Sequence, residues 1–243
     1  MNKNKILSQV HPLILEGICH RGLHNEKDIE NGMNAFRNAL NAHMAFELDV
    51  HLSKDGKLVV CHDSDLTRVT GKPGIIEHLS YEEIRDTYPL KDGEIIPILS
   101  DVFELVQEKV PIVLELKVYE KNYKELAEAV SEALKAIQNK QSVLLISFDP
   151  RSLFPFKGSG FLRELLVSTE YRRTWFFRHF FEGVDLDWRF MNEKRFRRYS
   201  HRHFVNVWTI DQKEKLDAVL PCADTVTFQF MEPESIRDAL KNR

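Results

Sequence analysis

In the stretch AFELDVHL, residues 45–52, two acidic side chains interrupt an apolar run that predicts a buried β-strand. Residues two apart in a strand share a face, so Glu47 and Asp49 point the same way. A second apolar run, Ile112–Leu116, contains Glu115 in the same manner. Charge inside a buried strand is costly unless it is paired or coordinates a metal. The three carboxylates therefore form a candidate site for a hard divalent cation, Mg²⁺ or Ca²⁺.

Strand candidates alternate with amphipathic helix candidates along the whole chain. Between residues 123 and 139, apolar Leu126, Val130, Leu134 and Ile137 recur at helical spacing. About eight strand–helix units in roughly 250 residues are typical of a (β/α)₈ TIM barrel, although a doubly wound open sheet shows the same alternation. The strand candidates are Ile14–Cys19, Ala45–Leu52, Leu58–Cys61, Ile112–Leu116, Val143–Phe148, Glu164–Ser168, Gly183–Asp187, Phe204–Ile210 and Thr225–Phe228. The helix candidates are Gly32–Ala42, Leu99–Lys109, Tyr123–Asn139, Tyr171–Phe181, Asn192–His201, Asp211–Leu220 and Pro233–Lys241.

One segment interrupts this alternation. Residues 63–97 are mostly polar, contain several glycines and prolines, and include one short helix candidate at Tyr81–Thr87. A long insertion at the C-terminal end of a strand often carries function; the alternative is a mere surface excursion. No linker rich in Gly, Pro or Ser divides the chain, so we expect one domain, 1–243, that includes this insertion after the second barrel strand region.

Composition limits the class of protein. A hydrophobic content of 43% and a charged content of 29% are ordinary for a globular chain, and the net charge of −3 argues against nucleic-acid binding through a general basic field. The three cysteines have no paired spacing and suit a reducing compartment. The sequence shows no signal-peptide core and no apolar run near the roughly 20 residues that span a bilayer. We therefore expect a cytoplasmic protein.

Two of the ten histidines stand out because each ends an apolar run at an expected barrel rim. With unperturbed pKa values of about 6.5, one of His20 and His62 can act as a general base and the other as a general acid near neutral pH. Arg21 offers a planar fork for phosphate oxygens, and Lys117 a point charge beside the carboxylates. His51 shares a strand face with the acidic pair and is a further candidate to approach a metal. These groups together favour metal-assisted cleavage of a phosphate ester.

Short motifs follow one another from about residue 18 to residue 117 and become sparser afterwards. They are His20-Arg21-Gly22, Glu30-Asn31, Ala35-Phe36, Glu47-Leu48-Asp49-Val50, Lys54-Asp55-Gly56, Val59-Val60-Cys61-His62-Asp63, Leu66-Thr67-Arg68, Thr70-Gly71, Gly74, Ile96-Pro97, Leu99, Leu114-Glu115-Leu116-Lys117, Ile146-Ser147-Phe148 and Val207-Trp208-Thr209. In order and spacing the chain resembles the glycerophosphodiester phosphodiesterases, a family of (β/α)₈-barrel metal hydrolases.

The resemblance implies roles for the residues already singled out. Glu47, Asp49 and Glu115 match the family's metal carboxylates, for one divalent ion. His20 and His62 match its general acid/base pair.

Further residues match the part of the family's site that holds the substrate. Arg21 and Lys117 correspond to residues that bind the phosphate. The insertion after His62 corresponds to a subdomain that shapes the glycerol end of the cleft. Trp208 resembles a tryptophan that lines the pocket, with a core aromatic residue as the alternative.

The implied activity is metal-dependent hydrolysis of a glycerophosphodiester, a small-molecule substrate, to sn-glycerol 3-phosphate and an alcohol. A lysophospholipase D-type or sphingolipid-type phosphodiesterase on the same barrel is an alternative, and a non-catalytic binding barrel a more distant one. Head-group preference, the choice between Mg²⁺ and Ca²⁺, and the oligomeric state stay open. So do the route, through a cyclic phosphate or direct attack by water, and the order in which the two histidines act.

The chain departs from the family pattern in two places. Gly32 stands where the family usually has a threonine after Glu-Asn, which removes a hydroxyl that can cap the following helix. At the last strand the family commonly has Thr-Asp-x-Pro, whereas this chain has TFQFMEP at residues 227–233. We expect the second change to affect substrate scope more than chemistry.

Aromatic and arginine residues are interleaved in Tyr171–Phe181, and four further arginines follow between residues 195 and 202. The simpler interpretation is an outer helix whose rings pack on the barrel and whose arginines are solvated. Such a stretch can also lie at a membrane surface or contact a lipid-like substrate. Rings exposed beside the mouth of the active site would favour a lysophospholipid substrate and peripheral membrane contact through residues 171–181.

Overall fold

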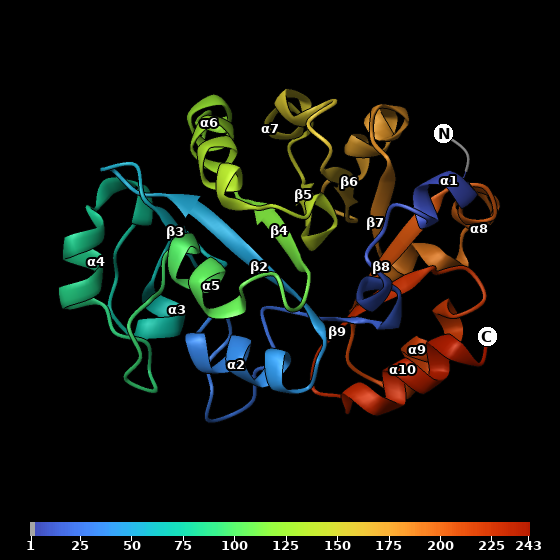
Figure 1. Ribbon diagram of the computed structural model, residues 1–243, viewed down its shortest axis with the longest axis horizontal. Helices are drawn as coiled ribbons and strands as arrows, with labels where there is room; N and C mark the ends of the chain where they lie inside the picture. The colour runs from blue at the N-terminus through green and yellow to red at the C-terminus, as the bar shows by residue number, and fades with distance from the viewer. Residues whose placement is uncertain (1–2) are drawn as a thin grey trace.

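Eight parallel strands close into a barrel in the computed structural model, which describes residues 3–243 (Figure 1). The first strand pairs with both the second and the last, and this closure excludes the open doubly wound sheet. The (β/α)₈ fold is therefore confirmed. The barrel strands are β1 (Ile18–Cys19), β2 (Ala45–Leu52), β4 (Ile112–Leu116), β5 (Val143–Ser147), β6 (Leu162–Val167), β7 (Gly183–Asp187), β8 (Phe204–Ile210) and β9 (Thr225–Phe228).

Helices surround the barrel, with α6 and α7 along one side and α2, α9 and α10 along the other (Figure 1). The predicted apolar stripe of α6 is buried at Leu126 and Val130, as an amphipathic helix on a sheet requires. None of the helices formed by residues 3–243 is both long and apolar enough to cross a membrane. The α-helices outside the insertion are α1 (Lys3–Leu7), α2 (Met33–Asn41), α5 (Leu99–Val106), α6 (Tyr123–Ala133), α7 (Pro150–Leu153), α8 (Lys194–Ser200), α9 (Lys213–Val219) and α10 (Pro233–Lys241).

Apolar side chains fill most of the barrel interior at the N-terminal ends of the strands, where the buried Glu164 of β6 is an exception. Ile18, Ala45 and Val113 point inward there and form one buried cluster with Ile6 and Ile14 from the amino-terminal segment. Apolar filling at this end leaves the C-terminal ends of the strands to carry the polar side chains, as in other barrels of this type.

The insertion begins earlier than residue 63. Strand β3 (Leu58–Val60) pairs antiparallel with β2 and is not a barrel strand, so the prediction of a parallel unit at Leu58–Cys61 is wrong. Residues 53–57 are too few for a parallel crossover, which takes about a dozen residues, and they form a turn with Gly56 at φ 81°. The helix at Tyr81–Thr87 (α4) is confirmed, and the segment, which also contains α3 (Thr67–Thr70), has its own small hydrophobic cluster.

Two further segments differ from their predicted structure. Residues Pro12–Glu16 form a 3₁₀ turn (η1), and only Ile18–Cys19 is a strand, because Pro12 starts the turn and Gly17 adopts φ 109°. Residues Arg172–Phe180 form a 3₁₀ segment (η6) in place of an α-helix, and Trp175 is its only buried side chain. Its aromatic residues recur at spacings of four but on several faces, so they do not form the single apolar stripe of an amphipathic helix.

The missing threonine at Gly32 is compensated from the insertion. Gly32 is the N-cap of α2 and offers no side chain, but Glu94 Oε2 accepts a hydrogen bond of 3.2 Å from the backbone N–H of Asn34. A Cβ at residue 32 would lie 2.7 Å from that same oxygen. Glu94 therefore occupies the place of the hydroxyl and satisfies one of the free donors of the first helical turn.

Candidate active site

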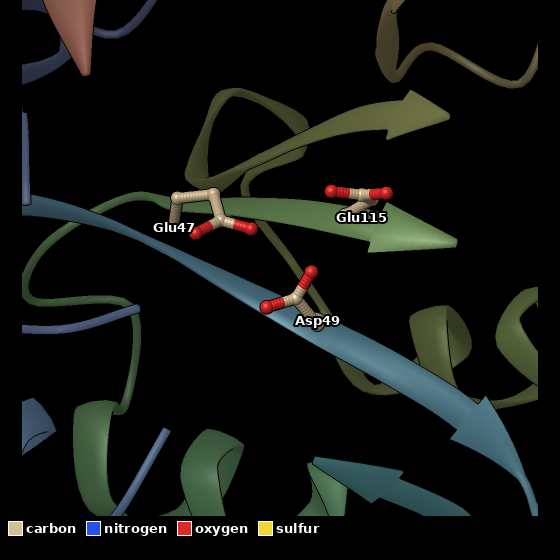
Figure 2. A group of neighbouring side chains, drawn as sticks. All are labelled: Glu47, Asp49 and Glu115. Atoms are coloured by element: carbon tan, nitrogen blue, oxygen red, sulfur yellow. The ribbon is translucent and has the colours of Figure 1, made fainter. Parts of the chain in front are cut away.

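Three carboxylates converge from two neighbouring strands, Glu47 and Asp49 from β2 and Glu115 from β4 (Figure 2). The register pairs Asp49 with Glu115 across the two strands. One oxygen from each of the three lies within 4.8 Å of the others, and all three side chains are buried. Three acidic oxygens this close together are arranged to hold a hard cation.

Burial and mutual repulsion set the charge of this acidic cluster. Burial raises the pKa of Glu115 to about 7, where the nearby Asp49 charge also raises it and Lys117 opposes the shift. The pKa of Glu47 is raised for the same reasons, burial first and then the charges of Asp49 and Glu115. Burial would also raise the pKa of Asp49, but Lys117 and other cationic neighbours hold it below its ordinary value. Arg21 opposes the rise in the pKa of Glu47 but does not cancel it.

Arg21 and Lys117 supply the positive charge beside the cluster. The Arg21 backbone N–H donates to Glu47 Oε2 at 2.9 Å, and its guanidinium Nε lies 3.5 Å from Asp49 Oδ2. Lys117 Nζ lies 3.0 Å from Glu115 Oε1 and 3.4 Å from Asp49 Oδ1. The Oδ1 atom of Asp49 accepts no hydrogen bond and remains available to a ligand. Arg21 and Lys117 therefore offset part of the negative charge of the cluster.

Each predicted catalytic histidine is held through Nδ1. His20 Nδ1 lies 2.8 Å from Gln229 Oε1, and His62 Nδ1 lies 2.6 Å from Asp63 Oδ1. Because both partners are acceptors, the Nδ1–H donates to them and Nε2 is the basic nitrogen of each ring. Burial lowers the pKa of His20 to about 3, with the Arg21 charge contributing, and burial also lowers the pKa of His62. Both rings are therefore neutral at pH 7.

Two cavities meet at these residues. The inner one has a volume of about 220 Å³ and is lined by both histidines, Arg21 and Trp208. The outer one has a volume of about 760 Å³ and is lined by Lys117 together with several aromatic side chains. His62 lines both, so it stands at their junction. A small polar group fits the inner cavity, and the outer one has the size usual for an organic ligand.

Several polar residues that support the site were not predicted to do so. Asn31 Nδ2 donates to Asp49 Oδ2 at 2.9 Å, and Gln229 lies in the loop after β9. His51, a candidate to approach a metal, bonds instead to Glu77 Oε1 at 2.6 Å and to the His62 carbonyl at 3.1 Å. In the sequence, only the motif Glu30-Asn31 could have indicated the role of Asn31.

Glu30 connects the site to the insertion and predicts a pH-dependent stability. It accepts from Arg21 Nη1 at 2.7 Å and from two nitrogens of Arg68, at 2.8 and 2.9 Å. Although burial opposes it, this pairing lowers the pKa of Glu30 from 4.5 to about 2. A lowered pKa means that the stabilisation is complete above about pH 4.5 and is lost as the pH falls towards 2.

We expect Glu30→Gln to lower the free energy of unfolding by about 2–3 kcal/mol at pH 7, since one pKa unit corresponds to about 1.4 kcal/mol and solvent screens part of the pairing with Arg68. At pH 3 the difference between the two proteins should be clearly smaller. Urea unfolding at the two pH values measures both quantities. A difference that is equal at both would show that packing, and not charge, accounts for the effect.

A parallel barrel with acid, base and cationic side chains at the C-terminal ends of its strands is the arrangement of a barrel enzyme. The model of the Glycerophosphoryl diester phosphodiesterase family matches residues 20–184. The chain belongs to this family.

Individual relatives agree with that assignment. The chain is 36% identical over 147 residues to a glycerophosphodiester phosphodiesterase of Bacillus altitudinis, covering 57% of this chain and 60% of the relative. It is 35% identical over 131 residues to the lysophospholipase D GDPD1 of Rattus norvegicus, covering 49% of this chain and 40% of that protein. The chain thus spans 60% or less of the length of these two curated relatives.

Solved structures match over nearly the whole chain. The glycerophosphodiester phosphodiesterase of Thermotoga maritima is 28% identical, with a TM-score of 0.75, covering 96% of this chain and 99% of that one. A phosphodiesterase of Oleispira antarctica in complex with the product sn-glycerol-3-phosphate is 24% identical, with a TM-score of 0.80 and coverage of 97% and 99%. At that identity the second likeness shows the fold alone.

Proposed function

We propose that this chain hydrolyses glycerophosphodiesters to sn-glycerol 3-phosphate and an alcohol with the aid of a divalent metal ion. The observation that carries the proposal is the buried group Glu47, Asp49 and Glu115 beside a cavity lined by His20 and His62. The named activity of the Bacillus altitudinis relative supports it.

The chemistry of the acidic cluster fits a hard cation. Glu47, Asp49 and Glu115 would hold Mg²⁺ or Ca²⁺, and Asp49 Oδ1 is a buried oxygen that accepts no hydrogen bond, with Lys117 Nζ at 3.4 Å. Such an ion would neutralise charge that develops on the phosphate during cleavage. The raised pKa of Glu47 supports this assignment, because a positive charge is what that carboxylate lacks.

The side chains of the protein account for the remaining steps. Arg21 and Lys117 bind non-bridging phosphate oxygens and stabilise their charge. One of His20 and His62 takes a proton at Nε2 from the attacking hydroxyl, of water or of the glycerol, as the new P–O bond forms. The other histidine first takes up a proton at Nε2 from solvent, and it gives that proton to the alcohol oxygen as the old P–O bond breaks. Trp208 lines the inner cavity that would receive the glycerol, and the insertion contributes Asp63, which orients His62.

A second candidate is a lysophospholipid or sphingolipid-type diester, which is favoured by the outer cavity. Phe148, Phe154, Tyr171 and Phe177 line that cavity and offer an apolar wall next to the phosphate position. A non-catalytic binding barrel is the least favoured alternative, because six of the seven predicted acids, bases and cations line these two cavities and the seventh, Asp49, adjoins Glu47 and Glu115. We also propose that the chain works as one domain in a reducing compartment such as the cytoplasm, which its three free cysteines support.

The test is ³¹P NMR of metal-stripped protein with glycerophosphocholine, glycerophosphoethanolamine and lysophosphatidylcholine, before and after Mg²⁺ or Ca²⁺ is added. We expect metal-dependent release of glycerol 3-phosphate from the water-soluble diesters. Turnover of lysophosphatidylcholine alone would favour the second candidate. No turnover of any of the three by folded, metal-bound protein would reject the substrate class.

A further inference from the structure

Exposed aromatic side chains gather at one place on the surface. Among residues 3–243, seven large hydrophobic side chains are exposed, and five of them lie in or directly beside η6. Phe176 is the most exposed, at 76%, and the ring of Phe180, at 57%, lies 5.8 Å from that of Phe154. Within Tyr171–Phe181, the interpretation that the rings pack on the barrel holds only for Trp175 and Phe181. We call Phe154, Tyr171, Phe176, Phe177 and Phe180 the aromatic surface.

The aromatic surface is continuous with the catalytic cavities. The ring centroids of Trp208, which lines the inner cavity, and Phe148 are 5.8 Å apart. The ring centroids of Phe148 and Tyr171 are 5.0 Å apart. Tyr171 and Phe177 line the outer cavity, and Phe176 and Phe180 stand beyond it, away from both cavities. An apolar path therefore leads from the predicted cleavage site to the outside of the molecule.

The same region is basic although the chain as a whole is acidic. Residues 171–202 contain nine Lys or Arg against four Asp or Glu, in a chain of net charge −3. Two of the four acids, Asp185 and Asp187, are buried. Arg172 is paired with Glu193 at 2.7 Å, whereas Arg173 is exposed and has no ion-pair partner among the described residues. The surface around the exposed rings therefore complements negative charge.

We propose that the aromatic surface docks on an anionic lipid–water interface and receives a single-chain phospholipid from it. Exposed rings interleaved with arginines suit the boundary between acyl chains and phosphate head groups. A protein partner bound to this surface would block the outer cavity, whereas a lipid surface would deliver substrate molecules to it. The docking is independent of catalysis, and its link to the substrate rests on the second candidate function above, a lysophospholipid diester.

Docking is tested with metal-stripped protein, so that turnover plays no part. Flotation with phosphatidylglycerol–phosphatidylcholine vesicles should carry the unmodified chain upward, and phosphatidylcholine vesicles should do so less. Phe176→Ser/Phe180→Ser should weaken binding to the anionic vesicles by about tenfold, because both rings lose their apolar contact. The matched control is Ile95→Ser, which removes an exposed apolar side chain in the insertion, and it should leave binding unchanged. Circular dichroism verifies that each variant is folded.

Absence of vesicle binding, or equal loss in the Ile95→Ser control, would overturn the proposal. So would a dimer in size-exclusion chromatography that the double variant abolishes without any vesicle binding, since a second copy would then be the occupant. With metal restored, the double variant should turn over micellar lysophosphatidylcholine about tenfold more slowly and glycerophosphocholine at an unchanged rate. Docking without any turnover would reject the proposed function and leave the docking proposal intact. Turnover without docking would reject the docking proposal and leave the proposed function intact.

Discussion

Replacing His20 or His62 by alanine is expected to lower the turnover of glycerophosphodiesters by about 10²–10⁴-fold, the range of general acid–base catalysis. Each ring is neutral at pH 7 and presents Nε2 as its basic nitrogen, because Gln229 and Asp63 accept from Nδ1. Initial rates from ³¹P NMR at saturating metal measure the effect. The double variant should be little slower than the slower single one, since the two groups act in one step.

His201→Ala is the matched control, because His201 is exposed and contacts neither cavity. A diester with a phenolic leaving group, which departs without a proton, separates the two roles. Its cleavage should recover in the variant that lacks the acid and stay slow in the one that lacks the base. Full turnover by both single variants would reject the hydrolase mechanism.

The sequence predicts regular elements well where local pattern and burial agree. The strands Gly183–Asp187, Phe204–Ile210 and Thr225–Phe228 and the helix Pro233–Lys241 have the predicted bounds. Each is supported by a local signal: alternating apolar residues for Gly183–Asp187, β-branched and aromatic residues for the other two strands, and Pro233 at the first turn of the helix. The proximity of Glu47 to Asp49 follows in the same way from the two-residue period of a strand.

Long-range features had no such local signal. The pairing of β3 with β2 depends on a five-residue turn whose neighbouring strands look like any other apolar run. Gln229 is 209 residues from His20 in the chain, so only the closed barrel brings the two together. Likewise, the exposure of Phe176 and Phe180 could not be predicted, since the same letters suit a packed helix.

The acidic cluster predicts opposite stability effects for two similar substitutions in the metal-free protein at pH 7. Glu47 has a raised pKa, so its charge opposes folding, and Glu47→Gln should raise the melting temperature. Asp49 has a lowered pKa, so its charge favours folding. Asp49→Asn should therefore lower the melting temperature, because Arg21 and Lys117 lose their shared partner.

Added metal should remove this contrast. The unmodified protein should be stabilised by Mg²⁺ or Ca²⁺, by about 2.7 kcal/mol at one hundred times the dissociation constant, whereas neither variant should respond at that concentration. Turnover by both should fall by roughly 10²-fold or more, since the charge on the phosphate is no longer neutralised. Differential scanning fluorimetry with EDTA and with metal measures the stabilities, and the exposed Asp217→Asn on α9 serves as the control. If Glu47→Gln alone kept the metal response and full turnover, Glu47 would not be a ligand. If Asp49→Asn kept them as well, a cation site built on β2 and β4 would have to be abandoned.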